Sequence, residues 1–571
     1  MQGMLKILST SLTLLLFASS DSRAEDSKAV QLGPGYAACG EMTRFWRGKP
    51  IIGRWMGQGS LADAPTFYNQ SSFPYKKRRY KQEVEMADFL TTPRLLGGWH
   101  PDKGGKGELE KHKHVADADL VYRKKDGTLA YRWELLDLRL TRFIKAGYTD
   151  LTLVLDQIPY CLAKKHHLET YGQASPPDDL QEWYVFIRDL CKELKRRYGT
   201  KTANGFRFRL GTELGDGKRI ALTQQQLHEM YFLTHKAIKE VLPEAKLGPW
   251  NEAGFKGRQE RAPLKVLELA KFAKKHKLAF DFASVSSYSI PKVRGSRILG
   301  TNPQQKAEVD AKYFTLLRKV FPGIPAEYHE FGILNSQYGV VTSEPGSRGG
   351  AHRAHYLLTA LEHKSLDRLY HWPVFDSIGT DRKLGPIQLL RSNGWLYSIL
   401  EHAAEGKLYM LKGNAAAGNT LYKSALITSP KKSFLIVSAY TLDRRKQDKP
   451  TITITLPKSI VQNKPPKNGV VEYVALTPET DIYRTVKADL AKANNLNPEF
   501  AKHPDLVAPV KSMATKFAGA RKMITANYPA YRKQMEQSLT LKPFDSKIKV
   551  DEKALSLRFS LPTDSVVVFV W

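Results

Sequence analysis

Strand-like and helix-like segments alternate along the chain from about residue 48 to residue 404. Continuous apolar runs such as TDLTLVLDQIP (residues 149–159) are typical of strands in a sheet that is buried on both faces. The clearest helical segment between such runs begins after Pro176-Pro177-Asp178 and ends at Gly199. Eight strand–helix units of this kind predict a parallel sheet, which fits a closed (β/α)8 barrel. An open doubly wound sheet is the structural alternative, and it is disfavoured because no glycine-rich phosphate loop follows the first strand.

The expected strands and helices can be placed along the chain from their periodicity. The strands are expected at 49–55, 94–99, 149–159, 206–212, 245–250, 280–289, 324–334 and 367–375. The helices are expected at 80–90, 133–147, 178–198, 223–241, 264–272, 311–320, 352–361 and 395–404. Thr223 and Gln226 predict a capping box at the start of the fourth helix, since each side chain can bond the backbone of the other.

The pattern changes after about residue 405, where short β-type runs such as TITITLP and SVVVFVW dominate. Runs of this length with turn residues between them predict a β-sandwich. A lysine-rich helical insertion at about 481–537 interrupts them. We therefore expect a signal peptide at 1–24, a (β/α)8 barrel at 25–404 and a β-sandwich domain at 405–571.

The first residues predict export from the cytoplasm. Lys6 is followed by an apolar run from Ile7 to Ala18 and then by small residues up to Ala24. This arrangement is typical of a secretory signal peptide, and the run is too short to span a bilayer. We expect a periplasmic or secreted protein, cleaved near Ala24 and not inserted in a membrane.

The charge of the chain indicates an anionic partner. Its 88 Lys and Arg residues against 57 Asp and Glu residues give a net charge of +31. Such a field favours nucleic acid, anionic lipid, or a polysaccharide carrying sulfate or uronic acid groups. Nucleic acid is disfavoured because no RNP, zinc-finger or helix-turn-helix pattern is present and because the protein is expected to be exported. Neither a metal nor a cofactor is expected, because no Cys/His cluster has the spacing of a zinc site.

Three glutamates lie at the ends of predicted strands, where barrel enzymes place their active sites. Glu213 follows the fourth strand, Glu252 follows the fifth and Glu330 ends the seventh. Strands four and seven lie on nearly opposite sides of an eight-stranded barrel, so Glu213 and Glu330 can converge, whereas Glu252 is expected in a loop. Two converging carboxyl groups are what glycoside hydrolysis requires. Taken singly, each glutamate is also compatible with an ordinary rim residue or ion-pair partner.

Several segments resemble glycoside hydrolase family 39, which includes β-xylosidases and α-L-iduronidases. The resemblance covers roughly residues 90–405 and rests on YRWELLDLRLTRFIKAGYTDLTLVLDQIPYCLA, PPDDLQEWYVFIRDLCKELKRRYG, KLGPW and PAEYHEFG. It implies that Glu213 is the acid/base and Glu330 the nucleophile of a retaining mechanism. At the position of the family's Asn before the acid/base stands Thr212, and Ser286 or Ser287 stands where the family has a His before Tyr288. These departures point to a different sugar, another hydrogen-bond donor or a catalytically impaired relative.

Aromatic rings at predicted strand ends can stack on sugar faces, and basic residues in the predicted loops can pair with sulfate or carboxylate groups. The residues expected to contact substrate are Trp55, Trp99, His100, Thr212, Trp250, Tyr288, Trp372, Lys164, Arg294 and Arg382. The predicted function is a retaining glycoside hydrolase acting on an anionic polysaccharide. The alternatives are a carbohydrate-binding or scaffold protein with an inactive barrel, and a β-xylosidase-like enzyme for neutral sugars.

Overall fold

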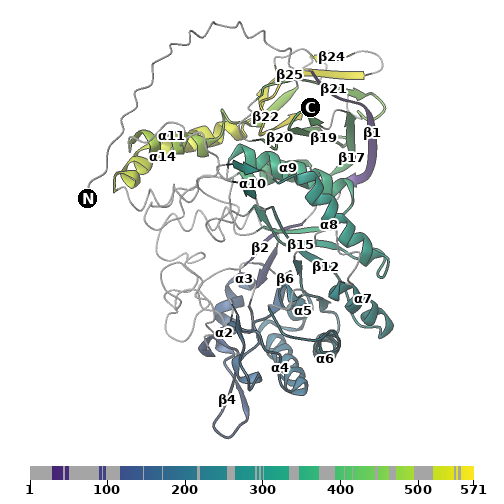
Figure 1. Cartoon of the computed structure of the whole chain (residues 1–571), viewed down its shortest axis with the longest axis vertical. Helices are drawn as coiled ribbons and strands as arrows, with labels where there is room; N and C mark the ends of the chain where they lie inside the picture. Colours follow the sequence, from purple (N-terminus) through teal and green to yellow (C-terminus); the bar gives the residue numbers. More distant parts are fainter. Residues whose placement is uncertain are drawn as a thin grey trace, which may run out of the picture.

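The structure is a computed structural model of the whole chain (Figure 1). The residues it describes are 29–42, 46–50, 89–92, 94–97, 116–145, 147–148, 150–169, 172–214, 219–253, 264–289, 292–294, 297–299, 301–333, 346–371, 392–403, 405–413, 416–443, 448–461, 471–493, 518–544, 548–550 and 554–571.

Nine of the described strands form one parallel, curled sheet with the order β10-β9-β6-β3-β2-β16-β15-β12-β11. They are β2 (Trp46–Pro50), β3 (Phe89–Thr92), β6 (Leu151–Leu155), β9 (Arg207–Leu210), β10 (Lys246–Gly248), β11 (Glu252–Ala253), β12 (Ala283–Ser289), β15 (Ala326–Ile333) and β16 (Arg368–His371). The two edge strands β10 and β11 belong to one extended segment and are separated only by Pro249, Trp250 and Asn251. The sheet therefore curls until its two edges are parts of the same segment.

Gly248, the last residue of β10, packs closely against the next parallel strand. A Cβ atom on Gly248 would lie 2.4 Å from the ring of Phe282, so glycine lets the ring pack there. β10 pairs with β9, and β11 pairs with β12. The strand expected at 245–250 is thus present as β10, and β11 lies beyond it.

Helices follow the strands in the expected order. They are α4 (Leu180–Tyr198), α5 (Thr200–Asn204), α6 (Gln224–Val241), α7 (Lys265–Lys275), α8 (Pro303–Arg318), α9 (Ser347–Glu362) and α10 (Ser392–Leu400). The capping box of Thr223 and Gln226 is confirmed at the start of α6. The helix expected at 133–147 is divided into α2 (Glu134–Leu136), a π-helical turn (Asp137–Thr141) and α3 (Arg142–Lys145). In that turn the buried Arg139 donates hydrogen bonds to the carbonyl oxygens of Leu95 and Ala118.

The expected second strand lies earlier than its apolar pattern suggested. Phe89 and Leu90, expected at the end of a helix, begin β3, which pairs with β6 through Leu90 and Leu151. Residues 94–97, expected in the strand, form a turn instead. The pattern was misleading because β3 ends in Thr91 and Thr92, which are buried although they are polar.

Eleven of the described strands form a second, mainly antiparallel sheet. Its main path runs through β23 (Lys542–Pro543), β22 (Glu472–Leu476), β26 (Ser565–Val570), β20 (Ser433–Thr441), β19 (Thr420–Thr428), β17 (Gly406–Gly413), β1 (Val30–Met42), β21 (Thr451–Pro457), β25 (Ala554–Ser560) and β24 (Ile548–Val550), with β18 (Ala416–Ala417) beside β19. β1 corrects the expected domain boundary, because residues 30–42 belong to this sheet and not to the unit that was expected at 25–404.

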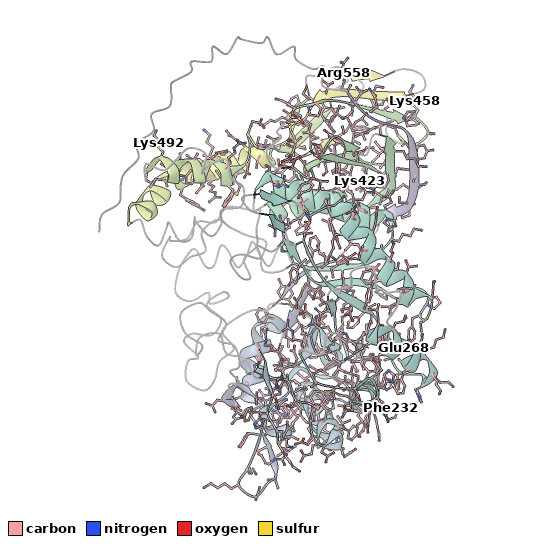
Figure 2. The ribbon with its side chains drawn as sticks, in the orientation of Figure 1. Phe232, Glu268, Lys423, Lys458, Lys492 and Arg558 are labelled. Carbon is pink, nitrogen blue, oxygen red and sulfur yellow. The ribbon has the colours of Figure 1, made fainter. Side chains whose placement is uncertain are left out.

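The central strands β19, β20 and β26 of this C-terminal sheet are buried on both faces. In β20, Phe434 and Ile436 join the main core together with side chains of α9, whereas Leu435 and Val437 join a second core. Figure 1 shows α9 between the two sheets. Lys423 of β19, which is labelled in Figure 2, forms an ion pair with Glu362 at the end of α9. The two sheets therefore share a continuous hydrophobic core through α9.

The helical insertion is present as α11 (Ile482–Ala493) and α14 (Ala518–Leu539), which project from the C-terminal sheet (Figure 1). Within the described ranges, no helix has the length and apolarity needed to cross a membrane.

Candidate active site

A column of charged side chains fills the interior of the curled sheet. Alternation along each strand directs Arg207 and Arg209 of β9, and Glu327 and His329 of β15, to the same side. Arg207 Nη2 donates to Glu327 Oε1 at 2.5 Å, and Arg209 Nη1 donates to His329 Nδ1 at 2.9 Å. Because Nδ1 accepts, the proton of the imidazole is on Nε2, which donates to Glu327 Oε2 at 2.7 Å.

The surroundings of His329 and Glu327 in this column determine whether each side chain is protonated. Burial lowers the pKa of His329 to about 3, so the imidazole is neutral near pH 7. Burial by itself would raise the pKa of Glu327, but the charge of Arg207 and the bond from His329 hold it at about 2. The column therefore gives the sheet interior a fixed pattern of charge beneath the strand ends.

A β-bulge brings Glu330 to the same side as this column. Along β15, residues Tyr328 and Glu330 pair with the consecutive residues Val285 and Ser286 of β12. The register towards β16 also contains one extra residue of β15 at this point. A strict alternation would direct Glu330 away from His329, and the extra residue re-aims it, as bulges near active sites commonly do.

The Glu330 carboxyl group has two neighbours with opposite effects. Tyr288 of β12 donates a hydrogen bond to Glu330 Oε2 at 2.6 Å. Burial and the negative charge of Glu213 nevertheless raise the pKa of Glu330 to about 7, against the lowering effects of Tyr288, Arg209 and Arg219. The structure thus brings the two predicted carboxyl groups close enough for the charge of Glu213 to act on Glu330.

Glu213 lies just beyond the end of β9 in a turn of unusual backbone conformation. Gly211 has φ +68°, and Glu213 itself has φ +53°, which is uncommon for a residue with a side chain. Such conformations cluster at functional sites, where surrounding structure enforces them. The Glu213 carboxylate accepts a hydrogen bond from Arg219 Nη2 at 2.6 Å, and both side chains are less than one-fifth exposed. Glu213 is therefore a carboxylate in an ion pair, and it lies close to Glu330, whose pKa is raised.

Thr212 connects the column to the strand ends. Its hydroxyl donates to Asp156 Oδ2 at 2.6 Å and accepts from Arg209 Nη2 at 2.8 Å. Arg209 also donates to the carbonyl oxygen of Gly211 at 3.1 Å. A hollow at this edge of the sheet is lined by Asp156, Thr212 and Arg219, among others. The site thus has two carboxyl groups, a tyrosine and an arginine around the ends of β9, β12 and β15.

A family model, glycosyl hydrolases family 39, matches residues 72–344, a range that includes both Glu213 and Glu330. Over this range the chain is similar to family 39 glycosyl hydrolases.

An α-1,4-L-rhamnosidase of Formosa agariphila is 25% identical to this chain over 249 residues. The alignment covers 41% of this chain and 47% of the rhamnosidase, so the chain spans about half the length of that curated relative. Solved structures show the same fold. A monomeric β-xylosidase of Caulobacter crescentus CB15 has a TM-score of 0.57 at 15% identity, covering 95% of this chain and 99% of the other. A family 39 enzyme of Xanthomonas axonopodis pv. citri has a TM-score of 0.56 at 14% identity, covering 95% and 97%.

The residues predicted to contact substrate lie in different parts of the structure, and some of them lie outside the described residues. Tyr288 lies in the site, and Lys164 is exposed in a loop after β6. Arg294 lies in the short strand β13 (Lys292–Arg294), where only the backbone is described. Trp55, Trp99, His100, Trp372 and Arg382 lie outside the described residues.

Two of the predicted contacts are wrong as direct contacts. Trp250 is fully buried, and its indole N–H lies 3.3 Å from Glu252 Oε2, so the ring packs in the core and has no face for a sugar. Glu252, which was expected in a loop, instead begins β11 and is buried. The hydroxyl of Thr212 is used for Asp156 and Arg209, so Thr212 supports the site from within the protein.

Several of the described basic residues lie away from the ends of the parallel strands. Arg348 is buried in α9 and forms an ion pair of 2.9 Å with Asp564. Lys458, Lys492 and Arg558 belong to the C-terminal half of the molecule (Figure 2). The net charge therefore includes structural pairs and residues far from the candidate site.

Asp156, Arg209 and Arg219 are the site residues that sequence reasoning missed. Asp156 ends the apolar run of β6, and Arg209 lies two residues after Arg207 in an otherwise apolar strand, so a charged residue inside a buried pattern was the available signal. Arg219 is one of many basic residues in the predicted loops, so the sequence did not distinguish it from the others. Among the described residues, no group of three or more Cys, His, Asp or Glu side chains could hold a metal ion.

Proposed function

We propose that this protein is a retaining glycoside hydrolase that cleaves an anionic oligo- or polysaccharide. In this mechanism Glu213 protonates the leaving oxygen while Glu330 attacks the anomeric carbon, and Glu213 then activates water against the covalent intermediate. The observation that carries the proposal is the electrostatic coupling of Glu213 and Glu330, the latter re-aimed by the bulge in β15.

The protonation state of the pair supports a two-carboxylate mechanism. A retaining enzyme needs one protonated and one ionised carboxyl group at the same time. Burial and the charge of Glu213 raise the pKa of Glu330 to about 7, so the two carboxyl groups differ in their surroundings. Tyr288 donates to Glu330 and stabilises its ionised form when it acts as nucleophile.

The sugar is proposed from several independent features. The rhamnosidase and xylosidase among the relatives, and the bacterial orthologue of α-L-iduronidase at a TM-score of 0.55, 11% identity and coverage of 95% and 83%, suggest three glycones to test. The net charge of +31 supports an anionic chain around that glycone. The alternative is a xylosidase-like activity on neutral sugars, which tests with the same glycones would detect.

The direct test uses 2-deoxy-2-fluoro glycosides of xylose, iduronic acid and rhamnose with good leaving groups. We expect one of them to inactivate the enzyme with the label on Glu330, and proton NMR of a cleaved substrate to show retention of the anomeric configuration. Glu330→Gln should take up no label, and Glu213→Gln should be labelled because the leaving group needs no acid. Absence of label and turnover for every glycone, with intact binding of glycans, would support a binding protein instead.

We also propose that the curled sheet closes as a (β/α)8 barrel and that the C-terminal sheet folds over as a β-sandwich. The edges β10 and β11 lie three residues apart in the chain, which supports closure. The second core joins Ile452 and Leu557 from one half of the C-terminal sheet to Leu435 and Val567 from the other, which supports a sandwich. Strand pairing across the closure can be tested by amide hydrogen exchange.

Export is proposed from the signal-peptide pattern of residues 1–24. Fractionation of the producing cells and determination of the mature N-terminus would test it. We expect a protein that begins at or close to Glu25, and a cytoplasmic protein with an intact Lys6 segment would contradict the proposal.

A further inference from the structure

The ion pair of Glu213 and Arg219 is at odds with the role of Glu213 as proton donor. An arginine 2.6 Å from a carboxylate stabilises the ionised form, whereas the acid of a glycosidase must carry a proton. Glu330, by contrast, must be ionised to attack, and burial together with the charge of Glu213 raises its pKa. The ion pair of the free enzyme therefore opposes the protonation that Glu213 needs for catalysis.

Among the described residues, Arg219 is the group that bonds the Glu213 carboxylate directly. Arg209 is committed to Gly211, Thr212 and His329, and Tyr288 is bound to Glu330, so both act on other groups. The Arg219 side chain is about one-fifth exposed, so part of it faces solvent beside Glu213. Guanidinium groups bind carboxylate and sulfate groups well, often in a bidentate manner.

We propose that Arg219 is a specificity-determining residue, drawn away from Glu213 by a carboxylate or sulfate group on the leaving-group sugar. Because Glu213 protonates the oxygen of the leaving group, an anion near Arg219 belongs to the sugar on that side of the scissile bond. When the arginine moves away, the ionised form of Glu213 loses its stabilising partner, and Glu213 can carry the proton that it gives to the leaving group. The acid is then protonated and the nucleophile ionised only when an anionic substrate is bound. The inference rests on the proposed function.

The test uses matched aryl glycosides of whichever glycone the labelling screen identifies. A 4-carboxyphenyl glycoside is compared with its methyl ester, which removes the charge and keeps the shape, and a 4-sulfophenyl glycoside distinguishes sulfate from carboxylate. The quantity measured is the ratio of kcat/KM for the charged and uncharged substrates, in wild type and in Arg219→Ala. Comparing this ratio between variants cancels the intrinsic reactivity of each leaving group.

We expect the preference for the charged substrate to fall by at least about tenfold in Arg219→Ala, the size of effect expected for loss of one charge-assisted pair. Arg219→Lys should keep part of the preference, since it keeps the charge and loses the planar fork. The matched control is Arg123→Ala, because Arg123 forms an exposed ion pair of 2.8 Å with Glu182 outside the site. It should leave the ratio unchanged.

The pH dependence supplies an independent readout. With the uncharged substrate, Arg219→Ala should extend activity to higher pH, since the arginine no longer favours the ionised acid. The charged groups that act on the pair are Arg209, Arg219 and the two glutamates themselves, with Tyr288 as the neutral donor. Equal charge preference in wild type and Arg219→Ala would overturn the inference while leaving the hydrolase assignment intact. Failure of every glycoside to react or label would remove the proposed function and this inference with it.

Discussion

The hydroxyl of Tyr288 lies 2.6 Å from Oε2 of Glu330 and donates its hydrogen bond to the ionised carboxylate. This bond lowers the pKa of Glu330, while burial and the charge of Glu213 raise it. Tyr288 thus links strand β12 to Glu330 of strand β15, the proposed nucleophile, and opposes the electrostatic cost of ionising it.

Replacing Tyr288 with Phe should raise the pKa of Glu330 further, because a donor to the charged form is lost. The acidic limb of the kcat/KM profile should move to higher pH, and kcat/KM near pH 6 should fall by about 10- to 100-fold. Tyr131→Phe is the matched control, since Tyr131 donates to Asp189 at 3.0 Å outside the site. If the acidic limb of the kcat/KM profile shifted equally in Tyr288→Phe and Tyr131→Phe, or in neither, this role of Tyr288 would be contradicted.

Glu330 should make the folded protein less stable as the pH rises. Its pKa of about 7 in the folded state lies above the ordinary value of 4.5, so the folded state binds the proton more tightly than the unfolded state. Stability should therefore decrease between about pH 4.5 and pH 7 and be level above that. We compare the free energy of unfolding of Glu330→Gln with that of wild type at two pH values. The difference, variant minus wild type, should be more than about 1 kcal/mol larger at pH 8 than at pH 4.5, since one pKa unit corresponds to about 1.4 kcal/mol. Urea unfolding at the two pH values measures this, and a pH-independent difference would contradict it.

The hydroxyl of Thr212 should be needed even though it does not face the substrate. Thr212→Val keeps the shape and removes one hydrogen bond each from Asp156 Oδ2 and Arg209 Nη2 inside the protein, which should cost about 1–3 kcal/mol of stability. Thr212→Ser keeps the hydroxyl and should retain most of the stability and activity. Urea denaturation and kcat of the two variants, compared side by side, provide the measurement; similar values for both would show that the hydroxyl has no such function.

Glu327 should be among the most sensitive positions in the chain. Glu327→Gln leaves the buried guanidinium of Arg207 without its carboxylate, and breaking a buried pair in this way costs about 3–5 kcal/mol. Glu268→Gln is the control, because Glu268 pairs with Lys271 on the exposed face of α7 and should change stability by less than about 0.5 kcal/mol. Both are compared by thermal and urea unfolding, and equal losses would refute the structural role of the column.

Much of the fold could be predicted from local patterns. The helix from Leu180 to Tyr198, the capping box at Thr223 and the apolar strand at Leu151–Leu155 each depend on residues close in sequence, and each is present. The strand at Phe89–Thr92 was misplaced because its two buried threonines lack an apolar signal. The strand at Val30–Met42 was assigned to the wrong unit because its partners, β17 and β21, lie more than 350 residues further along the chain.

The sequence by itself determined which acids end the strands: Glu213 follows β9 and Glu330 lies in β15, since alternation and strand ends are local properties of the chain. Only the tertiary structure decided how those acids behave. The extra residue that re-aims Glu330 appears only in the register with β12 and β16, and the pairing of Glu213 with Arg219 depends on a folded turn. Register and charge partners arise from contacts between distant segments, and these contacts set both the direction of a carboxyl group and its affinity for a proton.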